Sequence, residues 1–285
     1  MTGHAVTWLD VFTAAPLAGN GLCVVHEADD LDDATMLAIA RETRLSETTF
    51  VQTATVDGAD YRNRIFAVQG ELPFAGHPSL GTAVAVARAR GQTAASFVQE
   101  TQAGLQPVEV ELDGTRARAS MRQEPATFGA EPDPAMVLAA VGLGPGDGHP
   151  EWTPQVVSTG IAHLMTPVVD DDALRRAAAD PELLPALLSD AEVVCLYLAA
   201  VDGAAGEAHA RSFFLGDVGV LEDPATGSAV GPLVAYVAQR AGISALAVRQ
   251  GEEIGRPSLL EARLDGDRVT VGGEVVVLAE GRTLF

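Results

Sequence analysis

Residues 75–91 read AGHPSLGTAVAVARARG, and residues 226–242 read TGSAVGPLVAYVAQRAG. The two stretches align without a gap, and each has a glycine in second place, Gly76 in one and Gly227 in the other. Each predicts a small and polar helix start, followed by an alanine- and valine-rich helix that ends at glycine. Two matching helices, one in each half of the chain, predict a fold of two pseudo-symmetric halves.

The two helix starts suit a ligand that carries negative charge. Glycine lets a ligand approach the backbone closely, and a helix N-terminus presents unpaired N–H groups and about half a positive charge. Two such termini at one site would supply positive potential without lysine or arginine. We therefore expect the backbone at Gly76 and Gly227 to contact a small substrate that bears a carboxylate.

The composition limits the class of protein. With 285 residues and 47% apolar residues, the chain has material for about two packed domains. Its 18 Lys and Arg against 39 Asp and Glu give a net charge of −21, which argues against nucleic acid and anionic membranes as partners. No basic leader with an apolar run opens the chain, and no long apolar run follows. We expect a soluble cytoplasmic protein.

Two further features bear on cofactors. Cys23 and Cys195 each lie in an apolar, strand-like run without metal-ligand spacing, which indicates buried structural thiols. No G-x-G-x-x-G follows a predicted strand and no P-loop lysine is present, so nucleotide cofactors are disfavoured.

Short strands around one long helix in each half predict an α+β fold, in which a curved mixed sheet wraps around a central helix, twice. The glycine-, proline- and acid-rich stretch 124–154 indicates the region between the domains. We expect a first domain at 1–122, joined by a C-terminal strand at 274–285, and a second domain at 123–273. The pattern also predicts a separate strand at 268–272.

Three blocks carry a resemblance to a known family: LSETTF at 45–50, ELPFAGHPSLGTA at 71–83 and EDPATGSA at 222–229. In this order, and over both halves, they resemble the PhzF family of phenazine biosynthesis, within the diaminopimelate epimerase superfamily. The resemblance implies a diaminopimelate epimerase-like pair of domains with the active site between them. It also implies a homodimer that uses no metal and no organic cofactor.

Glu47 is the candidate general base. It lies in an apolar, threonine-rich stretch with no basic residue within two positions. If it is buried, its pKa would rise toward the range of about 6–7 that suits a general base near neutral pH. A solvated strand glutamate is the alternative from the residues alone. The resemblance implies that Glu47 is the family's proton-carrying glutamate.

His77 precedes Pro78, and proline is favoured at the first helical position, so we expect the imidazole beside a helix start. The N–H dipoles there would lower the histidine pKa and keep the ring neutral. An ordinary capping role is the alternative. The resemblance implies an active-site histidine that contacts the substrate.

Asp223 and Ser228 flank the second helix start. Their residue types suit a turn or cap for Asp223 and an N-cap for Ser228. The resemblance implies that Asp223 contacts an amine or hydroxyl of the substrate, and that Ser228 and the Gly227 backbone bind its carboxylate. It also places Asn20 in the substrate site, although the family commonly has proline where Gly21 stands.

An absence bears on the reaction type. Epimerases of the superfamily resemble the same helix starts but carry a cysteine just before each glycine, where this chain has Ala75 and Thr226. Neither side chain can take a proton, so racemisation by a pair of thiols is excluded. Glu47 alone can take a proton from one carbon and return it to another on the same face. The resemblance implies such an isomerisation, as for trans-2,3-dihydro-3-hydroxyanthranilate in phenazine biosynthesis.

Two alternatives stay open. The first is an epimerase, racemase or other proton-transfer enzyme on an amino-acid-like substrate, with His77 or Asp223 as a second base. The second is a non-catalytic member of the fold, although both Glu47 and His77 are present.

Overall fold

A computed structural model describes residues 3–216 and 219–284. The chain forms two compact units, the first from residues 1–122 and 272–285 and the second from residues 123–271. The chain passes from one unit to the other inside two strands, β8 (Arg116–Gln123) and β17 (Arg268–Arg282). With 22% helix and 43% strand, the predicted α+β class is confirmed. No helix in the described ranges has the length and apolar character needed to cross a membrane.

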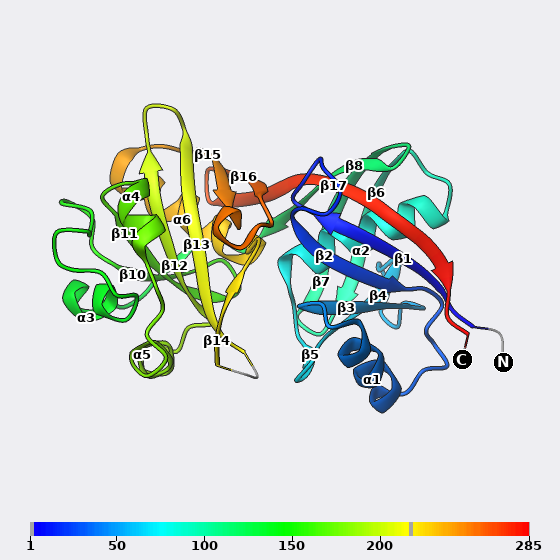
Figure 1. The fold of residues 1–285 in the computed structure, drawn as a ribbon. Coiled ribbons are helices and arrows are strands. Elements are labelled where there is room, and N and C mark those ends of the chain that lie inside the picture. The colour runs from blue at the N-terminus through cyan, green and yellow to red at the C-terminus, as the bar shows by residue number, and fades with distance from the viewer. Residues whose placement is uncertain (1–2, 217–218, 285) are drawn as a thin grey trace. The chain divides into compact units, whose positions relative to one another are not determined.

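The first unit is a closed ring of strands around one helix, α2 (Gly76–Ala89) (Figure 1). The ring runs β1-β2-β3-β4-β6-β7-β8-β17, and β17 pairs with β1 to close it. The pairs β2–β3 and β4–β6 are parallel. The elements not yet bounded are β1 (Ala5–Val11), β2 (Asn20–Val25), α1 (Asp33–Thr43), β3 (Glu47–Gln52), β4 (Tyr61–Ala67), β5 (Gly70–Leu72), β6 (Ala94–Thr101) and β7 (Gly104–Asp113).

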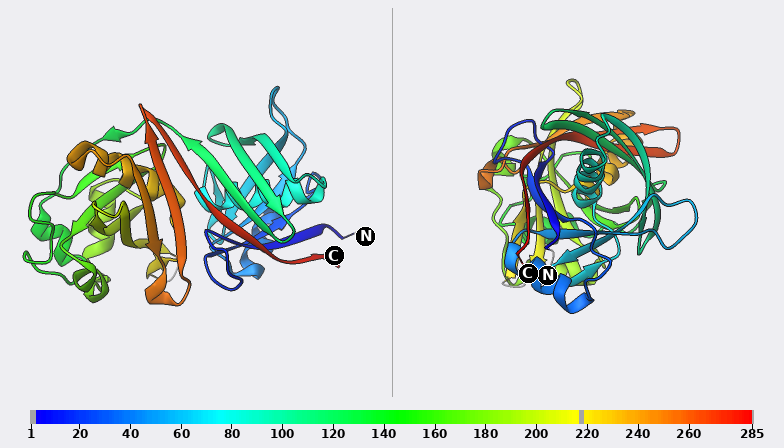
Figure 2. Two further views of the ribbon diagram at one scale, coloured as in Figure 1. Left: turned by 90° about the horizontal axis from the view of Figure 1, so that it is seen from above. Right: turned by 90° about the vertical axis from the view of Figure 1, so that its right-hand side faces the viewer.

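Helix α2 fits inside the ring because most of its buried residues are glycine, alanine, valine, serine or threonine. Residues 76–87 are all buried, and in the right-hand view of Figure 2 the helix is surrounded by strands. A Cβ atom at Gly81 would lie only 2.5 Å from Leu22 and 2.9 Å from Val11, so only glycine lets the helix approach β1 and β2 this closely. The predicted central helix of the first half is confirmed.

The second unit repeats this plan around α6 (Gly227–Ala241). Strands β10-β11-β12-β13-β15-β16 pair in the same sequence of antiparallel and parallel contacts as β1-β2-β3-β4-β6-β7. In this unit, a cluster of buried apolar residues packs three short helices against the sheet. The elements are β9 (Thr127–Phe128), α3 (Pro134–Ala139), β10 (Gln155–Ser158), β11 (Ala162–Val168), α4 (Asp171–Arg176), α5 (Leu183–Asp190), β12 (Cys195–Asp202), β13 (Glu207–Gly216), β14 (Gly219–Asp223), β15 (Ala245–Gln250), the 3-10 turn η1 (Glu252–Ile254) and β16 (Ser258–Asp265).

Equivalent ion pairs mark equivalent positions in the two units. On β4, Arg64 Nε donates to Glu71 on β5 at 2.8 Å, and on β13, Arg211 Nε donates to Glu222 on β14 at 2.9 Å. Each guanidinium also lies over the phenylalanine two residues further along its own strand. Arg64 in the first hairpin and Arg211 in the second therefore occupy equivalent positions.

This correspondence extends to the neighbouring strands. In the antiparallel registers, Phe50 lies opposite the first arginine and Leu198 opposite the second. Three residues earlier, Glu47 begins β3 and Cys195 begins β12. Glu47 and Cys195 thus occupy equivalent positions in the two units.

The structure corrects three details of the sequence reading. The terminal strands expected at 268–272 and from 274 are one continuous strand, β17, because Gly272 passes so close to β8 that a Cβ would lie 2.7 Å from the Ala119 carbonyl oxygen. Ser228 is not the N-cap of α6, since that position is Thr226. Pro78 is the third residue of α2 rather than the first.

Candidate active site

In the first unit, Glu47 and His77 lie side by side. Glu47 is the first residue of β3 and His77 the second residue of α2. His77 Nε2 is 3.3 Å from Glu47 Oε2, and the two side chains are 6% and 17% exposed. This distance is slightly beyond the hydrogen-bond reach of about 2.6–3.2 Å at which a general base exchanges a proton, so a small shift of either side chain would bring the pair into that range.

The imidazole of His77 is neutral. Burial lowers the pKa of His77 to about 3, while the backbone of Gly21 acts weakly in the opposite direction. The sequence analysis expected a lowered pKa from the helix dipole, and in the structure burial is the main cause. A neutral ring brings no positive charge to the Glu47 carboxyl group.

Asn20 belongs to the same unit. It begins β2 and is 1% exposed, and its Oδ1 accepts a hydrogen bond from Ser46, the residue before Glu47, at 3.4 Å. The next residue, Gly21, is the one whose backbone contacts His77. The fold therefore places Asn20 in the neighbourhood of the pair.

The starts of α2 and α6 differ from those of α1, α3 and α4. An aspartate side chain caps α1, α3 and α4, from Asp32, Asp133 and Asp170. The N-cap residues of α2 and α6, Ala75 and Thr226, make no side-chain capping bond. The N-cap residue therefore places no carboxylate at the positive end of either helix.

In the second unit, the start of α6 lies among the other predicted residues. Asp223 ends β14, Gly227 begins α6 and Ser228 follows it. Gln123 on β8 donates to the Gly227 carbonyl at 3.0 Å. The loop and helix start are thus tied to the sheet.

At the position equivalent to Glu47, the second unit holds a thiol. Cys195 Sγ lies 3.1 Å from His163 Nδ1. Burial raises the pKa of Cys195 to about 12 and lowers the pKa of His163 to about 3. Both groups are neutral near pH 7, and the expectation that Cys195 is a buried thiol is confirmed.

His163 is a residue that the sequence analysis missed. It lies against the backbone of Ser228. The helix residue four positions on is Pro232, which has no N–H to give to the Ser228 carbonyl, so the His163 ring lies where the helical hydrogen bond is missing. The apolar sequence around His163 contains no local signal of this contact.

Each unit thus gathers part of the predicted site. The first contains Asn20, Glu47, Gly76 and His77, and the second contains Asp223, Gly227 and Ser228. That the two groups serve one substrate stays a prediction.

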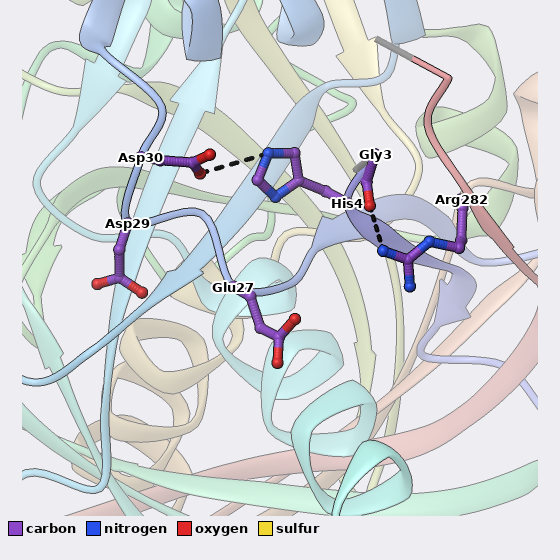
Figure 3. Close-up of a pocket in the computed structure, with 6 residues that line it drawn as sticks. All are labelled: Gly3, His4, Glu27, Asp29, Asp30 and Arg282. Atoms are coloured by element: carbon purple, nitrogen blue, oxygen red, sulfur yellow. Dashed lines mark hydrogen bonds and ion pairs between the residues drawn. The ribbon is translucent and has the colours of Figure 1, made fainter. Parts of the chain in front are cut away.

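A surface hollow in the first unit contains none of these residues. Figure 3 shows His4 against Asp30, at 3.4 Å, and Arg282 against the Gly3 carbonyl, with Glu27 and Asp29 beside them. Over residues 3–216 and 219–284, no three His, Cys, Asp or Glu side chains are grouped closely enough to bind a metal ion.

Comparison with known proteins gives consistent matches over the whole chain. Residues 9–281 match the family model PhzC-PhzF, described as phenazine biosynthesis-like protein. The trans-2,3-dihydro-3-hydroxyanthranilate isomerase of Pseudomonas aeruginosa is 39% identical, with 98% of this chain and 99% of that protein aligned.

Solved structures give the same result for the fold. A predicted epimerase from Pseudomonas aeruginosa superposes with a TM-score of 0.86 at 34% identity, over 99% of both chains. A hydroxyproline epimerase from Agrobacterium vitis, with bound trans-4-hydroxy-L-proline, superposes with a TM-score of 0.67 at 13% identity, over 99% of this chain and 91% of that one. This second likeness shows the fold alone.

Proposed function

The chain belongs to the PhzC-PhzF family of phenazine biosynthesis-like proteins and is an isomerase of that family, and from this premise we propose that it isomerises trans-2,3-dihydro-3-hydroxyanthranilate with Glu47 as the proton carrier. The substrate is carried over from the Pseudomonas aeruginosa relative, which aligns over nearly its full length. A role in phenazine biosynthesis is part of the same proposal.

One observation carries the proposal. Glu47 lies 3.3 Å from a neutral imidazole, whereas the equivalent position of the other unit holds the protonated thiol of Cys195. A single base of this kind supports a proton shift on one face of the substrate. It does not support removal on one face and delivery on the other by two equivalent bases.

In the proposed mechanism, Glu47 takes a proton from one ring carbon and the electron pair moves into the ring π system. The protonated Glu47 then returns the proton to another ring carbon on the same face, so the substrate gains and loses no atoms overall. His77 orients the Glu47 carboxyl group. The uncapped helix starts at Gly76 and Gly227 bind the substrate carboxylate, with Ser228 adding its hydroxyl.

Asp223 is proposed to accept a hydrogen bond from the substrate amine or hydroxyl. A carboxylate is an acceptor, and both substrate groups are donors. Asn20 supplies a second polar contact in the first unit. We also propose that the protein acts as a homodimer, which light scattering after gel filtration would test.

The test is turnover of trans-2,3-dihydro-3-hydroxyanthranilate in deuterium oxide, followed by substrate loss and by deuterium at each ring carbon. We expect wild type to consume the substrate, and deuterium at the carbon that receives the proton measures how far the proton on Glu47 exchanges with solvent before it is returned. Glu47→Gln should abolish turnover but keep binding, because the amide preserves shape and removes basicity. Glu109→Gln is the matched control, since Glu109 is an exposed residue of β7 in the same unit.

Other outcomes would contradict the proposal. Full activity of Glu47→Gln would remove Glu47 from the mechanism. Deuterium entering a single carbon with inversion, on an amino-acid-like substrate, would favour the epimerase alternative; the Pseudomonas aeruginosa structure at 34% identity is itself described as a predicted epimerase. No turnover and no deuterium exchange by wild type would contradict the choice of substrate.

A further inference from the structure

The loop that carries Asp223 is held at almost every backbone position by buried side chains of the second unit. Gln250, at the end of β15, is 0% exposed and donates from Nε2 to the Asp223 carbonyl at 2.7 Å. Ser258, at the start of β16, donates to the Pro224 carbonyl at 2.9 Å. The Thr226 N–H donates to Gln250 Oε1 at 3.2 Å. Side chains of β15 and β16, rather than of helix α6, therefore hold the loop.

These backbone contacts determine which way the Gln250 amide faces. The Thr226 N–H can only donate, so Gln250 Oε1 must face it, and the Asp223 carbonyl can only accept, so Nε2 must face that. The second N–H of Nε2 points to Thr226 Oγ1 at 3.0 Å, and Oε1 accepts a further bond from the Tyr197 hydroxyl at 2.9 Å. Both N–H groups and both lone-pair directions of the amide are used.

The amide in turn directs the hydroxyl of Thr226. Because Thr226 Oγ1 accepts from Gln250, its single hydrogen is left to donate, and Oδ2 of Asp223 lies 2.6 Å away. Oδ2 of Asp223 is thereby committed as an acceptor. A chain of contacts that starts at two backbone groups thus holds Oδ2 of the Asp223 carboxyl group.

We propose that Thr226, itself held by Gln250, is a positioning residue for Asp223: its hydroxyl fixes the direction and the acceptor character of the carboxylate that receives the substrate's amine or hydroxyl. This rests on the proposed function, because it gives Thr226 a role only if Asp223 contacts the substrate. The sequence analysis noted Thr226 only because epimerases of the superfamily have a cysteine at this position.

The first unit supports this assignment by contrast. Its residue equivalent to Thr226 is Ala75, which has no hydroxyl. Strand β6, which corresponds to β15, has a buried glutamine of its own, Gln99, which is also 0% exposed but accepts a hydrogen bond from Asn63 at 2.8 Å. The buried glutamine is thus repeated in both units, while the link to a helix N-cap hydroxyl and a loop aspartate belongs to the second unit.

The experiment compares Thr226→Val, which has the same shape without the hydroxyl, with Thr226→Ser, which keeps the hydroxyl. With trans-2,3-dihydro-3-hydroxyanthranilate, we expect Thr226→Val to lower kcat/KM about 10- to 100-fold, as for loss of one hydrogen bond to a charged group, and Thr226→Ser to restore most of it. Thr166→Val is the matched control, since Thr166 is a buried threonine of β11 in the same unit, and its hydroxyl donates to the Leu164 carbonyl at 3.4 Å.

A second readout needs no substrate. The carboxyl carbon of Asp223, assigned by its loss in Asp223→Asn, is titrated by NMR in wild type and in each threonine variant. Removing a donor to the ionised carboxylate should raise the Asp223 pKa in Thr226→Val, and leave it unchanged in Thr226→Ser and Thr166→Val. Circular dichroism checks that each variant is folded.

The two readouts separate this proposal from the proposed function. Wild type that neither turns over the substrate nor exchanges deuterium would contradict the proposed function, whereas the Asp223 titration would still test the contact with Thr226. An unchanged Asp223 pKa in Thr226→Val would overturn the positioning role. So would a Thr226→Ser variant as impaired as Thr226→Val, because shape rather than the hydroxyl would then matter.

Discussion

The starts of α2 and α6 are the same structure with different chemistry. Both helices lie on equivalent strands and begin without a side-chain cap. Beside the first start, the equivalent strand position holds Glu47, and beside the second it holds Cys195. The backbone scaffold is repeated and the ionisable groups are not, so the two units differ in chemistry at equivalent positions.

The histidines show the same asymmetry. In the first unit, His77 is in the helix and contacts the backbone of Gly21 on β2. In the second unit, His163 is on β11, the strand equivalent to β2, and contacts the backbone of Ser228 in the helix. In each unit, one histidine thus connects the helix start to a strand. The histidine comes from the helix in the first unit and from the strand in the second. Only in the first unit does this bring the imidazole to a carboxyl group, 3.3 Å away.

The substitution with the largest expected effect places in the first unit the cysteine that the second unit has at the equivalent position. In Glu47→Cys, we expect kcat to fall about 10²- to 10⁴-fold, the usual contribution of a general base, because a thiol with an ordinary pKa of about 8.5 is mainly protonated at pH 7. The measurement is deuterium-labelled turnover at pH 7.

Glu47→Asp is the control for that substitution, since it is shorter by a similar length but keeps a carboxylate. We expect it to retain clearly more activity than Glu47→Cys. Equal activity of the two variants would show that reach, rather than basicity, decides what happens at this position.

A smaller effect is expected on the free energy of unfolding, to which one buried histidine of each unit should contribute. His77 and His163 each have a pKa of about 3 against an ordinary 6.5, so between these values the unfolded chain binds protons that the folded chain does not. Stability must therefore fall as the pH drops below about 6.5, by about 1.4 kcal/mol per pH unit for each histidine. Urea unfolding at pH 7, 6 and 5 measures the slope.

The variant His163→Gln isolates one histidine from the other. Glutamine does not titrate, so the dependence of unfolding free energy on pH should become shallower by about 1.4 kcal/mol per unit between pH 6 and pH 5, whatever the substitution costs at pH 7. An unchanged slope would mean that His163 is not held neutral in the folded chain.

Much of the fold follows from local patterns in the sequence. The two central helices were predicted from a repeated glycine-led stretch, and the structure has both, α2 and α6. Glu47 and His77 were each identified singly. Their contact could not be derived, because it depends on β3 and α2 meeting inside a closed ring of strands.

The rest depended on partners distant in sequence. Gln250 acts on Asp223 and Thr226 from β15, and His163 acts on Ser228 from β11, in stretches whose patterns indicate only ordinary strands. Ser228 was interpreted as an N-cap from its residue type, but the helix begins one residue before it. Buried polar contacts of this kind appear only once the strand order is known.

The smallest predicted effect is at Cys195, and it tests the other half of the comparison. With a pKa of about 12, the thiol does not exchange a proton with a substrate near pH 7, so Cys195→Ser should change kcat by less than about threefold. Serine can replace the thiol as the hydrogen-bond partner of His163 Nδ1, which limits the loss of stability to about 1 kcal/mol. The measurements are labelled turnover and urea unfolding. A tenfold or greater fall in kcat, with the fold intact, would make Cys195 a second proton carrier, and the two units would then be chemical partners as well as structural repeats.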